Sequence, residues 1–414
     1  MEQVKNTSIV MDEKFDLDEF SDIRPYNDEE CLPVVKRLLD NNQLFFRLAK
    51  IAFPRITRIS PTWGALISRW TIVNRLRNVK DIKSFQLVMM NWFFFRMLAK
   101  TTDGINHQWL DNPTPEDKLK QGNLLLSNHR DIAVDPAVVA HSLFMRNNPL
   151  PLVGIGDNLL SNPYVADVMK LNRGFIVQRT LESAKQMFFA MQKLSKFIHY
   201  SIGQKENVWL AQREGRAKDS RDRTSRAVIK MLKLHSGKEE SWANALNPLN
   251  IRTVAISYQY DPCVIYKAKT LLEGNKKKKV GTDAADLDEL VQGITGKKGM
   301  VNVVVAKSIV WQDDVTLDEV IVKLDAEIIS NYKLYNSHFY CLKKLVDLGL
   351  EDEDKLTLAQ KVFKPETTEC KILEKSLTEK LGKEVYVTCL YIYANPILEK
   401  LSLIQDQENE RRAK

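Results

Sequence analysis

Residues 124–136 read Leu124-Leu125-Leu126-Ser127-Asn128-His129-Arg130-Asp131-Ile132-Ala133-Val134-Asp135-Pro136. An apolar run of strand length ends at Ser127, and a helix-like run begins at Pro136. This pattern predicts a strand that turns into a helix, with His129 in the corner between them. A side chain there projects from a rigid scaffold, and a carboxylate a few residues on can accept its second ring proton and fix the tautomer. The stretch therefore favours His129 as a catalytic base.

The same alternation of strand and helix recurs further along the chain. Strands are predicted at 123–127, 151–154, 174–178, 207–212, 253–260 and 301–307. Helices are predicted at 136–145, 163–170, 181–199 and 224–235. Such alternation implies an α/β fold with a central, mostly parallel sheet flanked by helices. Loops that carry catalytic residues are then expected at one edge of the sheet.

Changes in composition divide the chain into four predicted parts. Residues 1–32 are polar and acidic and read as a mobile or loosely docked arm, and residues 33–110 form an amphipathic helical region. The α/β domain spans 111–312, and a mainly helical extension, in which no motif is recognised, spans 313–414. In the second part, basic side chains alternate with Trp, Phe, Leu and Ile, which is typical of helices that dock on a membrane. Ordinary packing of amphipathic helices on their own domain is the alternative.

The overall charge suits an anionic partner. Sixty-one Lys and Arg against 53 Asp and Glu give a net charge of +8, which fits lipid headgroups, nucleic acid or a phosphorylated substrate. No zinc-finger or RNA-recognition signature is present, so nucleic acid is not an expected partner. Four consecutive lysines at 276–279 are typical of a solvated loop, with contact to anionic lipid as the alternative.

Cysteine usage and hydropathy bear on the compartment. The five cysteines are scattered and show no Cys-x-x-Cys spacing, which predicts free thiols in a reducing compartment. The first residues lack the apolar core of a signal peptide, and no apolar run reaches the ~20 residues that span a bilayer. We expect a cytoplasmic protein, peripheral on the inner face of the membrane. No Cys/His metal cluster and no Walker-type phosphate loop are recognised, so no cofactor is expected.

Two further blocks place polar side chains at the ends of predicted strands. The first runs Arg173-Gly174-Phe175-Ile176-Val177-Gln178-Arg179, and the second runs Val208-Trp209-Leu210-Ala211-Gln212-Arg213-Glu214-Gly215-Arg216. An arginine at a strand end offers a fork of donors that matches phosphate oxygens. Gly215, beside Glu214, permits close approach of the backbone to a ligand. Together the blocks predict a phosphate-binding pocket next to His129.

In their order, these blocks resemble the motifs of the glycerophospholipid acyltransferases, and of 1-acylglycerol-3-phosphate acyltransferases in particular. Asn128, His129, Asp135 and Pro136 match the signature Asn-His-x-x-x-x-Asp-Pro, although five residues instead of four separate the histidine from the aspartate. Asp135 is the expected partner of His129. Asp131 is the fallback partner and is expected to cap the helix that follows.

The other motifs match with local differences. The block that ends at Arg179 is similar to the second motif of the family. The next is similar to the third, Phe-Pro-Glu-Gly-Thr-Arg, except that Gln212-Arg213 precede the glutamate and Arg216 follows the glycine directly. The fourth motif, a strand that ends at a proline, is represented loosely by residues 254–258 and Pro262.

The resemblance implies direct acyl transfer. His129 would take the proton of an acceptor hydroxyl as it attacks an acyl thioester, while Asp135 holds the imidazole. Arg179 and Arg216 would hold the phosphate of the acceptor. The residues expected to bind substrate are Asn128, Arg130, Gly174, Arg179, Glu214, Gly215 and Arg216.

The implied partners are lipids and acidic acyl carriers. The expected acceptor is a lyso-phospholipid, 1-acylglycerol 3-phosphate, which would give phosphatidic acid, and the donor is acyl-CoA or acyl carrier protein. Another lyso-lipid acceptor, such as an aminoacyl lipid, and a non-catalytic protein that binds lipid surfaces remain as alternatives. A serine hydrolase is not favoured, because no Gly-x-Ser-x-Gly elbow is present.

Overall fold

A seven-stranded sheet lies at the centre of the computed structural model, which describes residues 17–42, 45–46, 49, 54–111, 121–160, 162–274 and 283–413. The strand order is β1-β7-β6-β2-β5-β3-β4. The strands are β1 (Thr102–Trp109), β2 (Leu124–Ser127), β3 (Leu152–Gly156), β4 (Gly174–Val177), β5 (Val208–Ala211), β6 (Arg252–Tyr258) and β7 (Gly299–Ser308). Neighbouring strands run parallel, apart from the antiparallel pair β6 and β7. The predicted mostly parallel α/β sheet is confirmed.

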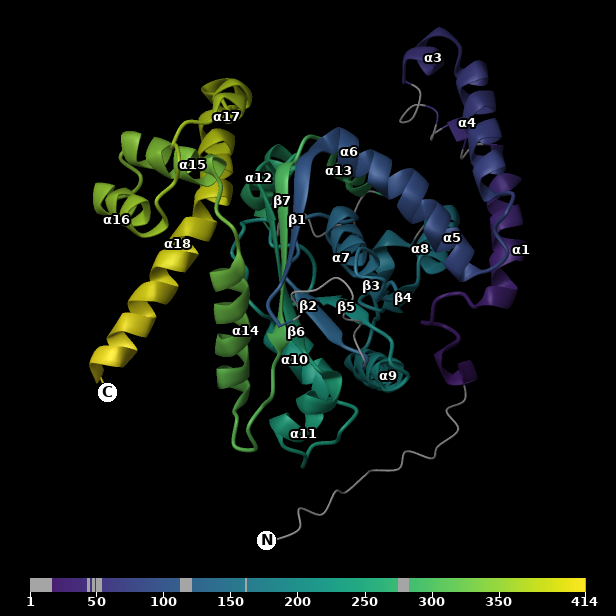
Figure 1. Ribbon diagram of the computed structural model, residues 1–414, viewed down its shortest axis with the longest axis horizontal. Coiled ribbons are helices and arrows are strands. Elements are labelled where there is room, and N and C mark those ends of the chain that lie inside the picture. The colour runs from purple at the N-terminus through teal and green to yellow at the C-terminus, as the bar shows by residue number, and fades with distance from the viewer. Residues whose placement is uncertain are drawn as a thin grey trace.

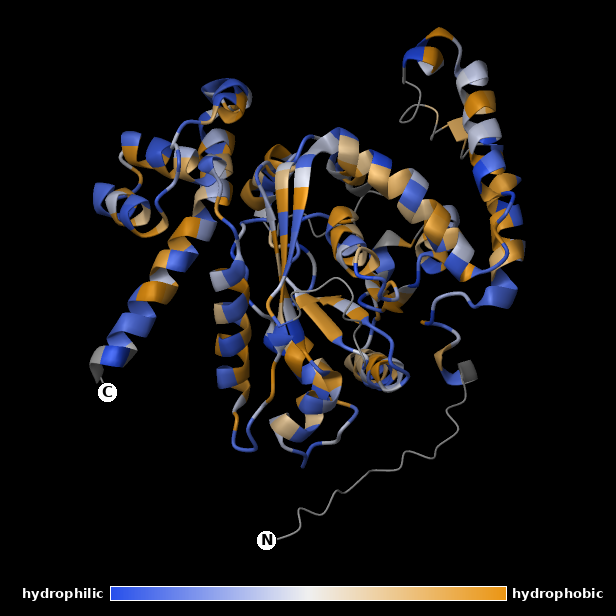
Figure 2. Cartoon of the chain, in the orientation of Figure 1, coloured by the Kyte–Doolittle hydropathy of each residue, from blue (hydrophilic) through white to orange (hydrophobic). Residues whose placement is uncertain are grey.

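Strand β2 lies near the middle of the sheet and is buried on both faces. Its side chains alternate between two cores: Leu124 and Leu126 pack into one, and Leu125 packs into the other. A continuous apolar run suits a strand in this position, because helices cover both sides of it. Figure 2 shows β2 as an apolar segment at the centre of the molecule.

Helices cover the two faces of the sheet. One face packs on α6 (Phe95–Thr101) and α7 (Val134–Phe144). The other packs on α9 (Ala184–Gly203), α10 (Arg226–Lys233), α11 (Trp242–Leu246) and α14 (Leu317–Asn331). Figure 1 shows α7 and α14 on opposite sides of the sheet. Short 3-10 helices lie at Leu17–Phe20, Asp157–Leu159, Asn247–Leu249 and Glu379–Leu381.

The N-terminal part differs from the prediction in three respects. The end of the predicted helical region 33–110 is strand β1, which pairs in parallel with β7 at the edge of the sheet. The predicted loose arm is docked from residue 17 onward, because Phe20 and Ile23 are buried in the core beside α9. Helix α1 (Asp28–Leu39) begins inside that predicted arm, where Asn27 caps its first turn. Residues 1–16 of the predicted arm lie outside the described residues.

The remaining N-terminal helices form a separate layer. They are α3 (Pro54–Ile59), α4 (Pro61–Leu76) and α5 (Ile82–Val88), followed by a π-helical turn at Met89–Phe94 that leads into α6. Helix α5 and α1 pack with α8 (Pro163–Leu171) around their own apolar cluster. Helices α3 and α4 extend away from the sheet (Figure 1). Within the described ranges, no helix combines the length and the apolar character that crossing a bilayer requires.

The C-terminal extension is helical, as predicted, and has its own core. Besides α14, which packs on the sheet, it contains α15 (Asn336–Asp347), α16 (Glu353–Phe363), α17 (Lys371–Ser376) and α18 (Lys383–Ala413). This core continues into α12 (Val264–Glu273), which follows β6. A further helix, α13 (Asp283–Thr295), leads into β7. The lysines at 276–279 lie outside the described residues.

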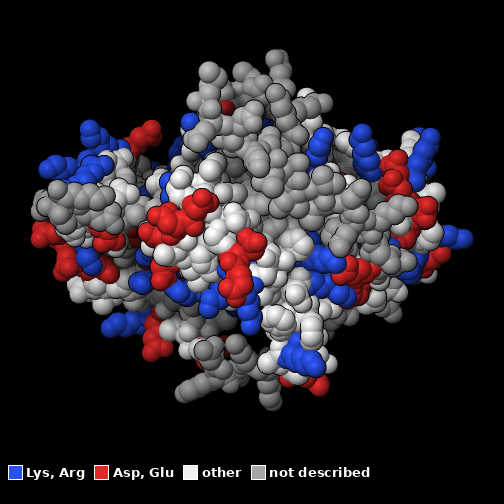
Figure 3. Space-filling view, turned by 90° about the horizontal axis from the view of Figure 1, so that it is seen from below, with Lys and Arg blue, Asp and Glu red and all other residues white. Residues whose placement is uncertain are grey.

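Charges of both signs are interspersed on the face of the molecule seen from below in Figure 3. In that view, groups of Lys and Arg lie next to groups of Asp and Glu, with areas of other residues between them. The net charge of +8 is therefore not displayed there as one basic patch.

Candidate functional site

His129 lies in the corner between β2 and α7, at the carboxyl edge of the sheet. Its Nδ1 is 2.7 Å from Oδ2 of Asp135, and its side chain is 14% exposed. The ring lies edge-on to the indole of Trp209, with 5.4 Å between ring centroids. Trp209 is itself fixed, because its Nε1 donates to Oγ of Ser127 at 2.9 Å. The imidazole is therefore held on two sides.

Asp135 is fully buried and accepts four hydrogen bonds. Oδ2 accepts from the backbone N–H groups of Arg130 (2.5 Å) and Asp131 (2.9 Å) as well as from His129, and Oδ1 accepts from the hydroxyl of Tyr258 at 2.7 Å. Burial by itself raises the pKa of Asp135. The hydrogen bonds from His129 and Tyr258 lower the pKa by more than burial raises it, so the pKa lies below its usual value. A charged Asp135 fixes the proton of His129 on Nδ1 and leaves Nε2 as the basic nitrogen.

Asp131, the fallback partner, makes different contacts. Its Oδ1 accepts from the backbone N–H groups of Ala133 (3.0 Å) and Val134 (2.9 Å), where α7 begins. Asp131 thus closes the turn that leads into α7 and is not the N-cap residue, which is Ala133 and makes no side-chain capping bond. The structure therefore pairs His129 with Asp135, and the extra residue between them lies in the turn before α7.

Asn128 and Arg130, both expected to bind substrate, point into the protein. The amide of Asn128 accepts from the N–H of Ile256 at 2.8 Å and donates to its carbonyl at 2.9 Å, which ties the end of β2 to β6. The guanidinium of Arg130 forms a buried ion pair with Asp222, with contacts of 2.5 and 3.1 Å. These contacts use the polar groups of both side chains and support structural roles for them.

Gly174 is required for packing. A Cβ atom added to it would lie 2.4 Å from Cδ1 of Ile155 and 2.7 Å from the carbonyl oxygen of Met169. Its position in β4 therefore explains the glycine without a ligand.

Arg179 and Glu214 approach each other across the end of β3. Arg179 is exposed, and its guanidinium lies against Gly156, since a Cβ added there would be 3.3 Å from Cζ. The carboxylates of Glu214 and Asp157 are close enough for their charges to act on Arg179. Glu214 is exposed as well, and its Oε1 accepts from the hydroxyl of Ser225 at 2.9 Å. The two blocks thus meet at one edge.

Gly215 and Arg216 lie in the loop after β5, residues 213–225. Gly215 has a φ of +77°, which disfavours other residue types, and no atom lies within 4 Å of the place where a Cβ would stand. Arg216 makes a two-point ion pair with Glu289 of α13, a partner that the sequence analysis missed. Both side chains of this pair are largely buried. The fork expected to hold phosphate is therefore occupied by a carboxylate.

The 213–225 loop and α13 both contact the corner that holds His129. The N–H of Ala217 donates to the carbonyl of His129 at 2.8 Å. Gly293 of α13 lies against Asp131, because a Cβ on Gly293 would be 2.4 Å from Oδ2. The structure thus brings His129, Gly215, Arg216 and Glu289 to one edge of the sheet. No local sequence pattern could have identified Tyr258 or Glu289. Tyr258 lies more than a hundred residues from Asp135, and Glu289 lies about seventy residues from Arg216.

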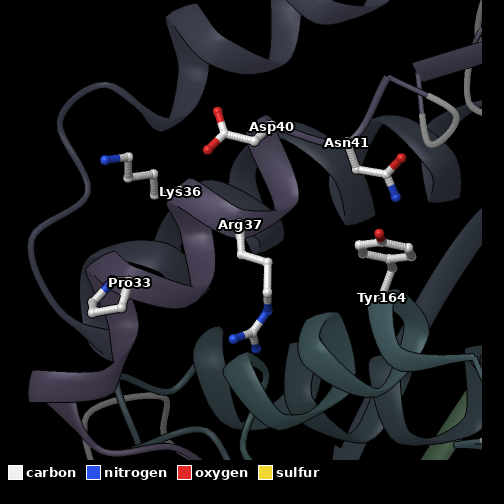
Figure 4. A pocket seen from close by; sticks show the side chains of 6 residues that line it. All are labelled: Pro33, Lys36, Arg37, Asp40, Asn41 and Tyr164. Atoms are coloured by element: carbon white, nitrogen blue, oxygen red, sulfur yellow. The ribbon is translucent and has the colours of Figure 1, made fainter.

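A separate hollow of about 380 Å³ lies between α1 and α8, away from this edge. Its lining residues are Pro33, Lys36, Arg37, Asp40, Asn41 and Tyr164. In Figure 4, Arg37 extends toward the neighbouring helix, where it binds Asp167 at 2.6 Å. The hollow is open to solvent and contains no group that contacts the His129 site. Across the described part of the chain, no three His, Cys, Asp or Glu side chains are grouped so as to hold a metal ion.

The geometry supplies a proton acceptor at the edge of a sheet. Nε2 of His129 receives no hydrogen bond from a described residue, and the ring is partly exposed. Such a nitrogen can remove a proton from a hydroxyl and return it to a leaving group. Comparison with protein-family models gives no match, and comparison with curated proteins gives no significant match.

Proposed function

We propose that this protein is an acyltransferase that moves a fatty acyl chain from an acyl thioester to a hydroxyl group of a lyso-phospholipid. The observation that carries the proposal is the buried hydrogen bond between His129 and Asp135 beside the loop that contains Gly215. The resemblance to glycerophospholipid acyltransferases supplies the reaction class. The acceptor that we propose first is 1-acylglycerol 3-phosphate, with phosphatidic acid as the product.

The reaction needs one base and no nucleophile from the protein. Nε2 of His129 takes the proton as the acceptor oxygen attacks the thioester carbonyl, and Asp135 stabilises the imidazolium. The tetrahedral intermediate then breaks its carbon–sulfur bond, and the proton on Nε2 passes to the thiolate. Ester, free thiol and neutral histidine are left. The donor is acyl-CoA or acyl carrier protein.

Arginines at the same edge support an anionic acceptor. Arg179 is exposed, and its planar fork matches phosphate oxygens. Arg216 could add a second fork after release of Glu289. Gly215 leaves room beside these groups for the backbone to approach the headgroup.

The α3–α4 pair supports docking on a membrane surface. Ile59, Trp63 and Trp70 are 88%, 65% and 70% exposed. Residues 54–80 contain six Arg or Lys and no Asp or Glu. Exposed indole rings with arginines around them suit the interface of an anionic bilayer. In Figure 1 these helices extend past the end of the sheet at which α12 and α13 lie. We therefore propose a peripheral position on the inner face of the membrane.

A second acceptor class is favoured by the ion pair between Arg216 and Glu289. Arg130 is also paired with a carboxylate, so two of the three arginines expected to bind substrate are neutralised. A site that presents both signs suits a zwitterionic headgroup, because Glu289 can bind an ammonium while Arg216 binds an anion. An aminoacyl lyso-lipid has such a headgroup.

The test is transfer of a labelled acyl thioester onto a panel of lyso-lipids by the purified protein with membrane lipids. Wild type and His129→Ala are compared side by side. Labelled phosphatidic acid from the wild type alone supports the first acceptor, and label on an aminoacyl lipid alone supports the second. Lipid binding without transfer to any acceptor would contradict the proposal and favour a non-catalytic protein that binds lipid surfaces.

A further inference from the structure

The 213–225 loop is held by side chains from the C-terminal part of the chain. Nδ2 of Asn395, on α18, donates to the carbonyl of Asp219 at 2.7 Å. Oδ1 of Asp325, on α14, accepts from the N–H of Thr224 at 2.7 Å. Both bonds reach the backbone, so they fix the path of the loop and not only its side chains.

An ion pair on the same face of α18 adds to these contacts. Glu399 binds Arg223 of the loop. It follows Asn395 by four residues, which places the two side chains one helical turn apart. One face of α18 is therefore directed at the loop.

Tyr332, between α14 and α15, contacts the corner of the site itself. The guanidinium of Arg130 lies over its ring, 4.9 Å from the centroid, and both side chains are buried. Arg130 also donates to the carbonyl of Ser220 at 3.1 Å and binds Asp222. The side chain of Arg130 thus joins the C-terminal part, the 213–225 loop and the corner after β2.

The backbone of Arg130 carries this restraint to the proposed base. Its N–H donates to Oδ2 of Asp135 at 2.5 Å, and the same oxygen holds Nδ1 of His129. Movement of Arg130 would move one of the donors that orient this carboxylate. A small displacement of a catalytic group lowers a rate strongly, because proton transfer requires close alignment.

We propose that Tyr332 is a positioning residue for His129, and that the C-terminal extension completes the candidate active site by clamping Arg130 and the 213–225 loop. The proposal rests on the proposed acyltransferase function. It gives the extension a role that no motif in its sequence suggested.

Three variants of the full-length protein test the proposal. Tyr332→Leu removes the ring under Arg130, whereas Tyr332→Phe keeps the ring and removes only the hydroxyl, which lies 3.3 Å from Nε2 of His338. Phe339→Leu is the matched control. Phe339 is buried in the C-terminal core, and this substitution also replaces an aromatic ring by leucine. Comparable melting temperatures of the two leucine variants make their activities comparable.

The expected result is a split between kcat and KM. Tyr332→Leu should lower kcat about tenfold, the rate equivalent of a desolvated cation–π contact, with the acceptor KM changed less than about threefold. Tyr332→Phe should keep kcat within about threefold of wild type, as should Phe339→Leu. Equal losses in Tyr332→Leu and Phe339→Leu would overturn the proposal, since they would mean general destabilisation.

Amide hydrogen exchange separates this proposal from the function on which it rests. Tyr332→Leu should speed exchange at Arg130, Asp131 and Ala217 relative to Phe339→Leu, whether or not acyl transfer is detected. Wild-type protein that transfers no acyl group, together with this change in exchange, would overturn the function and keep the clamp. Unchanged exchange at these amides would overturn the clamp.

Discussion

The hydroxyl of Tyr258 donates a 2.7 Å hydrogen bond to Oδ1 of the buried Asp135, on the carboxylate oxygen that His129 does not use. Tyr258→Phe would leave this oxygen buried without a donor. It should cost about 1–3 kcal/mol in unfolding free energy and raise the pKa of Asp135. We expect kcat to fall about tenfold, on the scale of one buried hydrogen bond, with little change in KM. Urea unfolding and steady-state kinetics measure both effects.

Tyr260→Phe is the control for that variant. Tyr260 lies two residues further on and packs into the C-terminal core instead of contacting Asp135. A loss of kcat of the same size in Tyr260→Phe would contradict the role assigned to Tyr258.

His129→Ala should lower transfer about 10²- to 10⁴-fold, the range of a general base. Asp135→Asn should also lower it, because an amide cannot stabilise the imidazolium as a carboxylate does. The double variant should be no slower than the slower single variant, since the two groups act as one unit. Circular dichroism establishes that each variant is folded; a folded His129→Ala protein with wild-type turnover would remove the proposed base.

Glu289→Gln should change acceptor binding, because it removes the charge that Arg216 now holds. We expect KM for 1-acylglycerol 3-phosphate to fall about three- to tenfold, because a guanidinium that no longer pairs with a carboxylate is available to the phosphate of the acceptor. Asp288→Asn is the matched control, since Asp288 is the exposed neighbour on the same helix. A rise in KM for a zwitterionic lyso-lipid, without a gain for the phosphate, would favour the second acceptor class.

Trp63→Ser and Trp70→Ser together should weaken binding to anionic phospholipid vesicles at least tenfold. Each exposed indole contributes on the order of 1 kcal/mol or more when it enters the interface, and the arginines around it make binding sensitive to salt. Vesicle sedimentation at two salt concentrations measures the effect. Val322→Ser, on the exposed side of α14, should bind as wild type does. Equal binding by all three proteins would argue against docking through α3–α4.

Stability should fall as the pH drops below about 6.5. Burial lowers the pKa of His107 to about 3, of His199 to about 4 and of His338 to about 3. An unfolded histidine binds a proton near pH 6.5, so protonation favours the unfolded state, and stability is fully present above that pH. At pH 5 each buried histidine should cost about 2 kcal/mol.

The measurement is the urea unfolding free energy at pH 7.5, 6 and 5. His107→Phe should reduce the loss between pH 7.5 and 5, because one site of proton binding to the unfolded chain is removed. An unchanged loss in this variant would mean that His107 does not contribute to the pH dependence.

The strands that surround the candidate site are predictable because they are buried. The apolar run of Leu124 to Leu126 and that of β5 are continuous, since helices cover both faces of the sheet. Strand β1 was missed because it lies at an edge and has a mixed, half-exposed composition, with Asn106 and His107 among its residues. Helix α6 leads into β1 without a connecting loop, so the sequence shows no clear boundary between helical and strand periodicity.

The position of His129 could be predicted, but several of its supports could not. Asp135 lies a few residues away and falls within the range of a local motif. Tyr258, Glu289 and Tyr332 reach the site from distant parts of the chain through pairings that only the fold determines. The same holds for Arg130, whose partner Asp222 converts an expected ligand-binding group into a buried ion pair.

The pairing of β1 with β7 means that β1 can join the sheet only after β7 has been synthesised. A ribosome adds β7 about 200 residues after β1, which at 5–20 residues per second is a delay of roughly 10–40 s. During that interval β2, β5 and β6 can already associate, while β1 has no neighbour. The polar composition of β1 lowers its tendency to aggregate during this interval. An apolar strand with unpaired edges would associate more readily with other nascent chains. Closure of the sheet by β1 therefore has to wait for β7, after β2, β5 and β6 have been made.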